Sequence, residues 1–160
     1  MIRLRGAAFT TAADGDQRAP RARADVAARL GLPTEWSEGT QVHGADVAVV
    51  ATAGDAGPVD GLVTTTPGLP LLVRTADCAA VVLHGPGSVG VAHAGWRGAA
   101  AGVVSSVIAA MEVLDGAPDR AVIGPHIGPC CFEVGPEVVE RFPHAGAETT
   151  WGTPSVDLAA

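Results

Sequence analysis

The chain has 160 residues, of which 48% are hydrophobic and 17% charged, a size and composition that fit one compact domain with its own core. Its 17 acidic and 10 basic residues give a formal net charge of -7, and every basic residue is arginine. These values argue against a disordered acidic module, a coiled coil and a broad nucleic-acid-binding surface. The 21 glycines, 12 prolines and 4% aromatic residues predict a strand-rich α/β or α+β domain, with an aliphatic core beneath many tight turns.

No apolar run approaches the roughly 20 residues that a membrane-spanning helix needs. The first six residues carry two arginines but no continuous apolar stretch, so we expect no secretory signal and a cytoplasmic location. The three cysteines cannot form an even disulfide framework, and a bridge between the adjacent Cys130 and Cys131 would be strained. Metal binding and thiol chemistry both stay open for the cysteines.

Helical and extended patterns alternate in the first half of the chain. Residues 19–31 are rich in strong helix formers and end on a Gly with a Pro beyond it, so a helix is predicted there. Residues 41–44 and 46–51 are expected to be extended, and residues 54–61 to form a loop. Short Val- or Leu-rich runs bounded by Gly, Pro or Asp predict three buried strands, at residues 69–74, 79–83 and 88–92.

The strongest helical pattern in the chain covers residues 99–114, where apolar residues recur at helical spacing. Three further elements are predicted after it: a strand at residues 121–123, a Gly- and Pro-rich loop at 124–131 and a short helix at 136–142. Ser155 resembles the N-cap of a helix that has no room to form within residues 154–160. No internal repeat or long linker divides the chain, so residues 1–160 are predicted to form a single domain.

Two histidines and one cysteine lie at the edges of predicted strands, each beside a turn: His43, Cys78 and His93. Two imidazoles and a thiolate suit a borderline-soft metal such as zinc, and three protein ligands leave a fourth position for water or substrate. The separations of 35 and 15 residues match no zinc-finger spacing. A buried neutral histidine at a strand end and an inert core cysteine are the alternative interpretation of these positions.

Arg97 lies in a Gly-Trp-Arg-Gly turn where the long predicted helix begins. Free backbone N–H groups and the helix dipole favour an anion there, so Arg97 is a candidate for binding phosphate or a carboxylate. The alternative is an arginine paired with a surface acid. Trp96 could stack on a base, but coverage of the core is the favoured interpretation.

Two aspartates sit next to these candidates. Asp60, in Val-Asp-Gly-Leu, and Asp77, directly before Cys78, could each orient a ligand histidine. Turn formation is the favoured interpretation for both. His84 and His144 have no accompanying motif and are expected to be structural or exposed.

Cys130 and Cys131 lie with His126 in the Gly- and Pro-rich loop, whose backbone must hold a defined shape. Rigid loops often line binding sites, so both cysteines are candidates for substrate contact. The sequence does not show which of the two thiols faces inward, and simple packing is the alternative.

Histidine and cysteine residues could also point to two other enzyme classes, a multicopper oxidase and a cysteine hydrolase. A multicopper oxidase needs about ten histidines, largely in His-x-His pairs, beside a blue-copper centre. The five histidines here contain no such pair, which excludes that class. A cysteine hydrolase stays open, with Cys78 as nucleophile and His43 or His93 as base, if no metal holds them.

At these same residues the chain resembles the YfiH-like, laccase-domain family, also called the multicopper polyphenol oxidase family. The resemblance covers about 100 residues in the middle of the chain and follows the family's order. It is carried by four stretches: QVHGADV (41–47), DGLVTTTPGLPLLVRTADCAAVVLHG (60–85), VGVAHAGWRGAAAGVV (89–104) and IGPHIGPCCFEVGPEV (123–138).

The resemblance implies an α/β fold with a mixed sheet core flanked by helices, and a zinc site, with copper as the other metal, at His43, Cys78 and His93. It also implies phosphorolysis of adenosine, inosine and methylthioadenosine, with adenosine deamination as a second activity. The expected catalytic residues are these three ligands and Arg97. The expected substrate-binding residues are Arg97, Trp96, Cys130 and Cys131, and the expected partners are a purine nucleoside and phosphate.

Some bacterial relatives are instead linked to editing of peptidoglycan precursors, which matches the cysteine-hydrolase alternative. The family's N-terminal Phe-Thr-Thr-Arg segment reads Phe9-Thr10-Thr11-Ala12 here, and family members continue past the equivalent of residue 160. We therefore expect a fold shortened at both ends. A shortened relative that keeps the metal site without catalysis is the third hypothesis.

Overall fold

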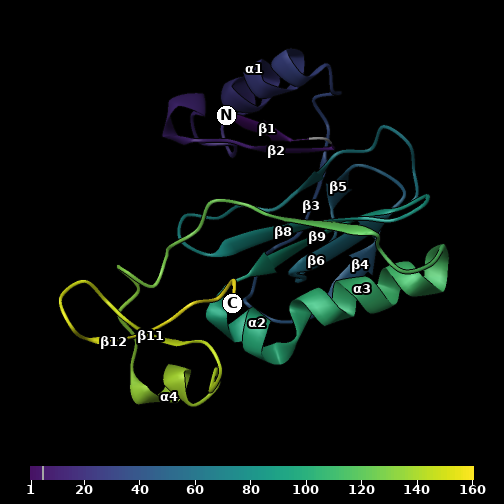
Figure 1. The fold of residues 1–160 in the computed structure, drawn as a ribbon. Helices are drawn as coiled ribbons and strands as arrows, with labels where there is room; N and C mark the ends of the chain where they lie inside the picture. The colour runs from purple at the N-terminus through teal and green to yellow at the C-terminus, as the bar shows by residue number, and fades with distance from the viewer. Residues whose placement is uncertain (5) are drawn as a thin grey trace.

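The computed structural model describes residues 1–4 and 6–160 and has a five-stranded mixed sheet at its centre (Figure 1). In spatial order its strands are β10 (Arg120–Ile123), β8 (Ala79–His84), β9 (Val89–Ala94), β6 (Gly61–Thr64) and β4 (Val47–Val49). β4 runs parallel to β6, and the other neighbours are antiparallel. The predicted mixed sheet core is confirmed, as are the strands at 79–83, 88–92 and 121–123.

Side chains alternate between the two faces of this sheet, as the period of two in a strand requires. Val81 and Leu83 of β8 join one apolar cluster, whereas Val82 between them joins another on the opposite face. The first cluster includes residues of α3 (Val103–Leu114), which lies with α2 (Trp96–Ala101) along one face of the sheet in Figure 1.

The predicted continuous helix over residues 99–114 is wrong in two respects. It begins earlier, at Trp96, and it is interrupted at Gly102, whose φ of 87° ends α2 in the left-handed conformation. Glycine adopts this conformation at no steric cost, so the chain turns there and restarts as α3. Val103, Val107 and Met111 then place an unbroken apolar stripe on the sheet, each fully buried.

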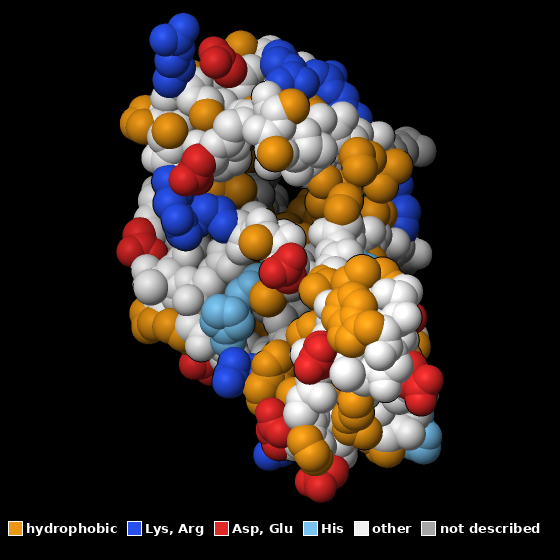
Figure 2. Space-filling view, turned by 90° about the vertical axis from the view of Figure 1, so that its left-hand side faces the viewer, with side chains coloured by type: hydrophobic (Ala, Val, Ile, Leu, Met, Phe, Trp, Pro, Cys, Tyr) orange, Lys and Arg blue, Asp and Glu red, His pale blue; other side chains and the backbone are white. Residues whose placement is uncertain are grey.

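The opposite face is covered by an N-terminal layer, which lies above the sheet in Figure 1. It holds β1 (Ile2–Leu4), β2 (Ala7–Phe9), the 3-10 helix η1 (Ala12–Asp14) and α1 (Pro20–Leu30). The predicted helix at 19–31 is confirmed as α1, which ends at Gly31 with a φ of 69°. Between this layer and the sheet lies a cavity of about 1380 Å³, lined by residues including Phe9, Leu71, Val82 and Val91. Figure 2 shows a hollow in this upper part of the molecule.

A small parallel sheet connects the two layers. It consists of β5 (Gly54–Asp55), β3 (Ser37–Glu38) and β7 (Leu71–Leu72). The strand predicted at 69–74 is therefore much shorter than expected. The loop predicted at 54–61 contains β5, and its last residue, Gly61, begins strand β6 of the five-stranded sheet.

The last part of the chain forms α4 (Pro136–Val139), β11 (Gly146–Glu148) and β12 (Pro154–Val156). The helix predicted at 136–142 is thus a single turn. The helix start predicted at Ser155 is wrong, because Ser155 is buried in β12 opposite Ala147 of β11. Within the described residues, no helix has the length and apolar content that crossing a bilayer requires.

Candidate metal centre

The three residues predicted as metal ligands meet at one edge of the central sheet. His93 lies in β9 and is 3% exposed, and Cys78 directly precedes β8. β8 and β9 are antiparallel neighbours with Ala80 opposite His93, so the start of β8 and the end of β9 share an edge. His43 approaches from the turn before β4, and its ring lies edge-on to that of His93 with centroids 4.8 Å apart. The ligand atoms of all three residues lie within 4.8 Å of one another.

Asp60 connects the two histidines and is 1% exposed. Its Oδ1 lies 2.8 Å from Nδ1 of His93 and accepts a hydrogen bond from the backbone N–H of His43 at 3.0 Å. Its Oδ2 accepts hydrogen bonds from the backbone N–H groups of Val42 at 3.1 Å and Gly44 at 2.7 Å. One buried carboxylate therefore shapes the turn that carries the first histidine and orients the ring of the second.

The charge state of Asp60 determines the tautomer of His93. Burial raises the pKa of Asp60, but the hydrogen bonds from His93 and from the 42–44 turn outweigh it and hold that pKa below its usual value. An ionised carboxylate only accepts hydrogen bonds, so Nδ1 of His93 carries the proton and donates it. Nε2 is then left with its lone pair, as a metal ligand requires.

The turn at residues 41–44 differs from the extended structure predicted there. His43 has a φ of 61°, a left-handed conformation that costs free energy in residues with a side chain. The three N–H groups of residues 42–44 converge on Asp60 and hold His43 in this conformation. Asp60 therefore stabilises the turn at residues 42–44 rather than only its own turn. Its bond to Nδ1 of His93 is the contact that the alternative, orienting role requires, and the metal-ligand role of His93 stays a prediction.

Two glycines leave room for the cluster. A Cβ atom on Gly95 would lie 2.8 Å from Sγ of Cys78 and 3.1 Å from Cδ2 of His43. A Cβ atom on Gly98 would lie 2.9 Å from the carbonyl oxygen of Gly44. Sequence reasoning did not single out Gly95 as part of the site, because nothing in the order of residues shows that this backbone contacts two ligands.

The donor set fits a zinc ion. Two imidazole nitrogens and one thiolate match its preference, and ligands about 2.0–2.3 Å from one tetrahedral ion lie roughly 3.3–3.8 Å apart. The spread of up to 4.8 Å is about 1 Å wider than that, a difference that side-chain rotation closes. Burial and the nearby carboxylates of Asp77 and Asp60 raise the pKa of the Cys78 thiol. A bound cation would reverse this effect, because a coordinating thiol is deprotonated.

Arg97 and Trp96 lie in the first turn of α2, close in sequence to His93. Trp96 is half-buried and Arg97 is exposed, and the guanidinium carbon of Arg97 stands 4.4 Å from the centroid of the Trp96 ring. In the part of the chain that the structure describes, Arg97 makes no ion pair, so the surface ion pair considered as an alternative is absent there.

Cys130 and Cys131 are exposed and stand beside each other outside the cluster of three ligands. Their loop lies beside the residues that precede β8, where the N–H of Ile127 donates a hydrogen bond to the carbonyl of Asp77 at 2.9 Å. His126 bonds within the same loop, to the carbonyl of Gly124. Of the histidines expected to be structural or exposed, His84 is half-buried and His144 exposed.

The match to a known family covers most of the chain. A family model described as multi-copper polyphenol oxidoreductase laccase matches residues 8–160. The chain belongs to this laccase family. The YfiH-like resemblance is thereby confirmed.

Two curated proteins illustrate the similarity within this laccase family. Purine nucleoside phosphorylase ORF3 of Streptomyces griseus is 44% identical over 159 residues, which cover 89% of this chain and 64% of that protein. Adenosine deaminase RL5 from an unknown prokaryotic organism is 45% identical over 91 residues, covering 54% of this chain and 35% of that protein. This member of the laccase family spans less than two thirds of the length of either relative.

Solved structures confirm the fold. YlmD from Geobacillus stearothermophilus superposes with a TM-score of 0.79 at 33% identity, over 89% of this chain and 62% of that chain. The Bacillus licheniformis hypothetical protein YfiH gives a TM-score of 0.75 at 28% identity, over 90% and 63%. The α/β architecture expected from the resemblance is therefore the one found.

Proposed function

We propose that this chain holds a zinc ion through His43, Cys78 and His93 and cleaves purine nucleosides with phosphate. The observation that carries the proposal is the convergence of these three side chains in a chain that belongs to the laccase family. Several relatives are named purine nucleoside phosphorylases. Copper is the alternative metal, because imidazole and thiolate ligands also suit it.

In this proposal each side chain has a defined task. Asp60 keeps Nε2 of His93 free and fixes the position of His43, so the two imidazoles face the same point. Arg97 binds phosphate through its exposed guanidinium, which neutralises part of the charge and orients the anion. Trp96 offers an indole face to the purine, and the loop with Cys130 and Cys131 forms a wall of the substrate site.

The reaction breaks the bond between C1′ of the ribose and the base nitrogen, and an oxygen of phosphate bonds to C1′. Positive charge develops on the sugar as the base departs, so a phosphate held close to C1′ stabilises the transition state. A zinc ion in the site would supply Lewis-acid polarisation of bound oxygen atoms. The products are the free base and ribose 1-phosphate.

The test is incubation of zinc-loaded protein with inosine and phosphate. We expect hypoxanthine and ribose 1-phosphate in equal amounts, and their loss in the Cys78→Ala variant. Adenosine is assayed in parallel, because one relative is named an adenosine deaminase and deamination would give inosine. Absence of free hypoxanthine at high concentration of protein with zinc confirmed bound would contradict the proposal and favour a metal-binding relative without catalysis.

The cysteine-hydrolase hypothesis receives less support from the geometry. Burial and the carboxylates near Cys78 raise the pKa of its thiol, which reduces the thiolate needed for nucleophilic attack. Chelation separates the two mechanisms, since activity that survives removal of zinc would favour the thiol.

A further inference from the structure

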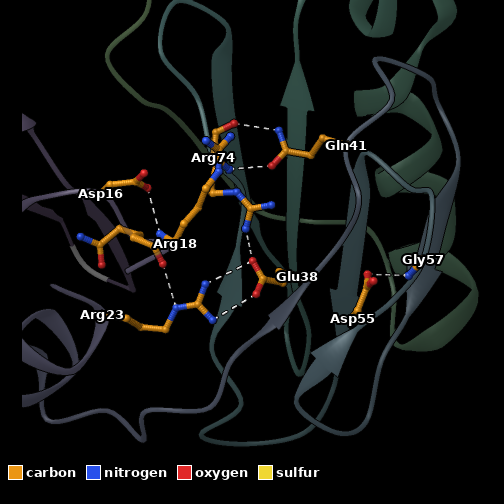
Figure 3. A network of polar contacts seen from close by, with 9 residues as sticks. Asp16, Arg18, Arg23, Glu38, Gln41, Asp55, Gly57 and Arg74 are labelled. Atoms are coloured by element: carbon orange, nitrogen blue, oxygen red, sulfur yellow. Dashed lines mark hydrogen bonds and ion pairs between the residues drawn. The ribbon is translucent and has the colours of Figure 1, made fainter. Parts of the chain in front are cut away.

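One side chain joins the segments that carry two of the proposed ligands. Nε2 of Gln41 donates to the carbonyl oxygen of Arg74 at 2.7 Å, and Oε1 of Gln41 accepts from the N–H of Arg74, also at 2.7 Å (Figure 3). Both ends of the amide are used, so its plane and its distance from the Arg74 backbone are fixed. The bonded segments are 33 residues apart in the sequence.

The position of this contact relates it to the metal centre. Gln41 precedes His43 by two residues, and Arg74 precedes Cys78 by four. The parallel pairing of β3 with β7 ends at Glu38 and Leu72, before either ligand is reached. In the described chain, no other hydrogen bond joins residues 39–44 to residues 73–78. Beyond the end of the β3–β7 pairing, the two hydrogen bonds of Gln41 therefore connect these segments.

Arg74 is itself anchored on its other side. Its guanidinium pairs with Glu38 of β3, and Glu38 also receives two hydrogen bonds from Arg23 of α1, at 3.1 and 3.2 Å. Figure 3 shows the three charged side chains pointing toward one another, with Gln41 on the far side of Arg74. Arg74, which Gln41 binds through its backbone, is therefore connected through Glu38 to α1 of the N-terminal layer.

This network also borders a cavity of about 560 Å³, lined in part by Arg18, Arg23, Glu38 and Arg74. Burial raises the pKa of Glu38, but the two arginines outweigh it and hold that pKa below its usual value. Glu38 stays ionised at neutral pH and pairs with both arginines, so it holds the side chains of Arg23 and Arg74 in place. The network thereby supports the backbone segment that Gln41 contacts.

We propose that Gln41 is a positioning residue of the metal centre, which sets the distance between the His43 turn and the Cys78 turn through the Arg74 backbone. The inference rests on the metal site of the proposed function. Gln41 touches neither metal nor substrate in this proposal. Its contribution is to hold the His43 turn and the Cys78 turn at the distance that metal binding requires, so that no free energy is spent on bringing them together when the metal binds.

The test compares zinc affinity, by competition with a chromogenic chelator, between the wild-type protein and three variants. Gln41→Ala removes both hydrogen bonds, whereas Gln41→Glu keeps the acceptor for the Arg74 N–H and loses the donor to its carbonyl. Gln17→Ala is the matched control, because Gln17 is a buried glutamine with two bonds to backbone carbonyls, of Asp14 and Gly15, in the N-terminal layer. Urea unfolding of each metal-free variant is measured alongside, and cobalt substitution reports whether Cys78 still binds.

We expect Gln41→Ala to weaken zinc binding by about 10- to 100-fold, the range found for residues that support metal ligands. Gln41→Glu should lie between Gln41→Ala and wild type, and it keeps the proposal testable if the alanine variant does not fold. Gln17→Ala should lose stability without losing zinc affinity.

Unchanged zinc affinity in folded Gln41→Ala would overturn this inference and leave the proposed function standing. Equal weakening by Gln17→Ala would also overturn it, because the effect would then follow stability alone. Failure of the wild-type protein to bind zinc would overturn the metal site itself, and with it this inference.

Discussion

Replacing Asp60 with asparagine removes one charge and one acceptor from the residue that contacts both histidine segments. If the new amide nitrogen takes the place of Oδ2, it faces the N–H groups of Val42 and Gly44, and the turn loses two hydrogen bonds. If it takes the place of Oδ1, it faces the N–H of His43, and Nδ1 of His93 must become an acceptor. The His93 proton then moves to Nε2, where the metal would bind.

The expected magnitudes follow from these contacts. Asp60 is 1% exposed, and the first orientation removes two hydrogen bonds to its carboxylate, whereas the second removes one and reverses the bond to His93. Hydrogen bonds to charged groups contribute about 1.5–3 kcal/mol each, so Asp60→Asn should lower the free energy of unfolding by about 3–6 kcal/mol in the first orientation and about 1.5–3 kcal/mol in the second. Both orientations also disturb a proposed ligand, so zinc affinity should fall by about 10- to 100-fold.

Urea unfolding of the metal-free protein and chelator competition measure the two effects separately. Asp77→Asn is the control: it removes an exposed carboxylate next to Cys78 whose side chain makes no hydrogen bond within the described residues. We expect the control to keep the stability of the wild type and to change zinc affinity far less than Asp60→Asn, because the Asp77 carboxylate raises the Cys78 pKa but also attracts a cation, and these two effects oppose each other. An Asp60→Asn protein with wild-type stability and wild-type zinc affinity would refute the reasoning.

Three further predictions follow from single contacts. Gly95→Ala should weaken zinc binding on the order of tenfold, measured by chelator competition, because the new Cβ atom would lie 2.8 Å from Sγ of Cys78; unchanged affinity would contradict this. Glu38→Gln should lower the free energy of unfolding by about 1–2 kcal/mol at pH 7. Since the pKa of Glu38 is lowered by folding, this difference should be full above the unfolded pKa of 4.5 and vanish as the pH falls through the lower folded value; a difference independent of pH would contradict it. Met111→Ala should cost about 2–5 kcal/mol in urea unfolding, because Met111 is 0% exposed between α3 and the sheet, and a smaller loss would show that the site collapses around the gap.

The hydrophobic pattern predicted the elements that are long and buried on one side, and it failed where a single contact decides the structure. The strands at 79–83 and 88–92 and the helix at 19–31 have strong local signals. Strand β6 of the five-stranded sheet was missed because its four residues follow a Gly-, Pro- and Asp-rich segment. The first position of this strand is a glycine, Gly61, because a Cβ atom there would lie 2.7 Å from both Val47 and Val107, a constraint that depends on distant residues.

The candidate ligands were predicted from residue type and position at strand edges, together with the family resemblance. They approach one point because β8 and β9 pair side by side. The sequence shows only that two apolar runs follow each other along the chain. The sequence offered Asp60 as a residue that could orient a histidine, but it gave no sign of the contacts of Gly95 and Gln41, which reach residues 17 or more positions away. Tertiary contacts of this kind leave no periodic signal.

The most direct test of the account is X-ray absorption at the zinc edge of the loaded protein. We expect one sulfur neighbour at about 2.3 Å and nitrogen neighbours at about 2.0–2.1 Å, with the sulfur shell lost in Cys78→Ala. A zinc ion surrounded only by nitrogen and oxygen, or a sulfur shell that survives this substitution, would contradict the claim that His43, Cys78 and His93 form one metal centre.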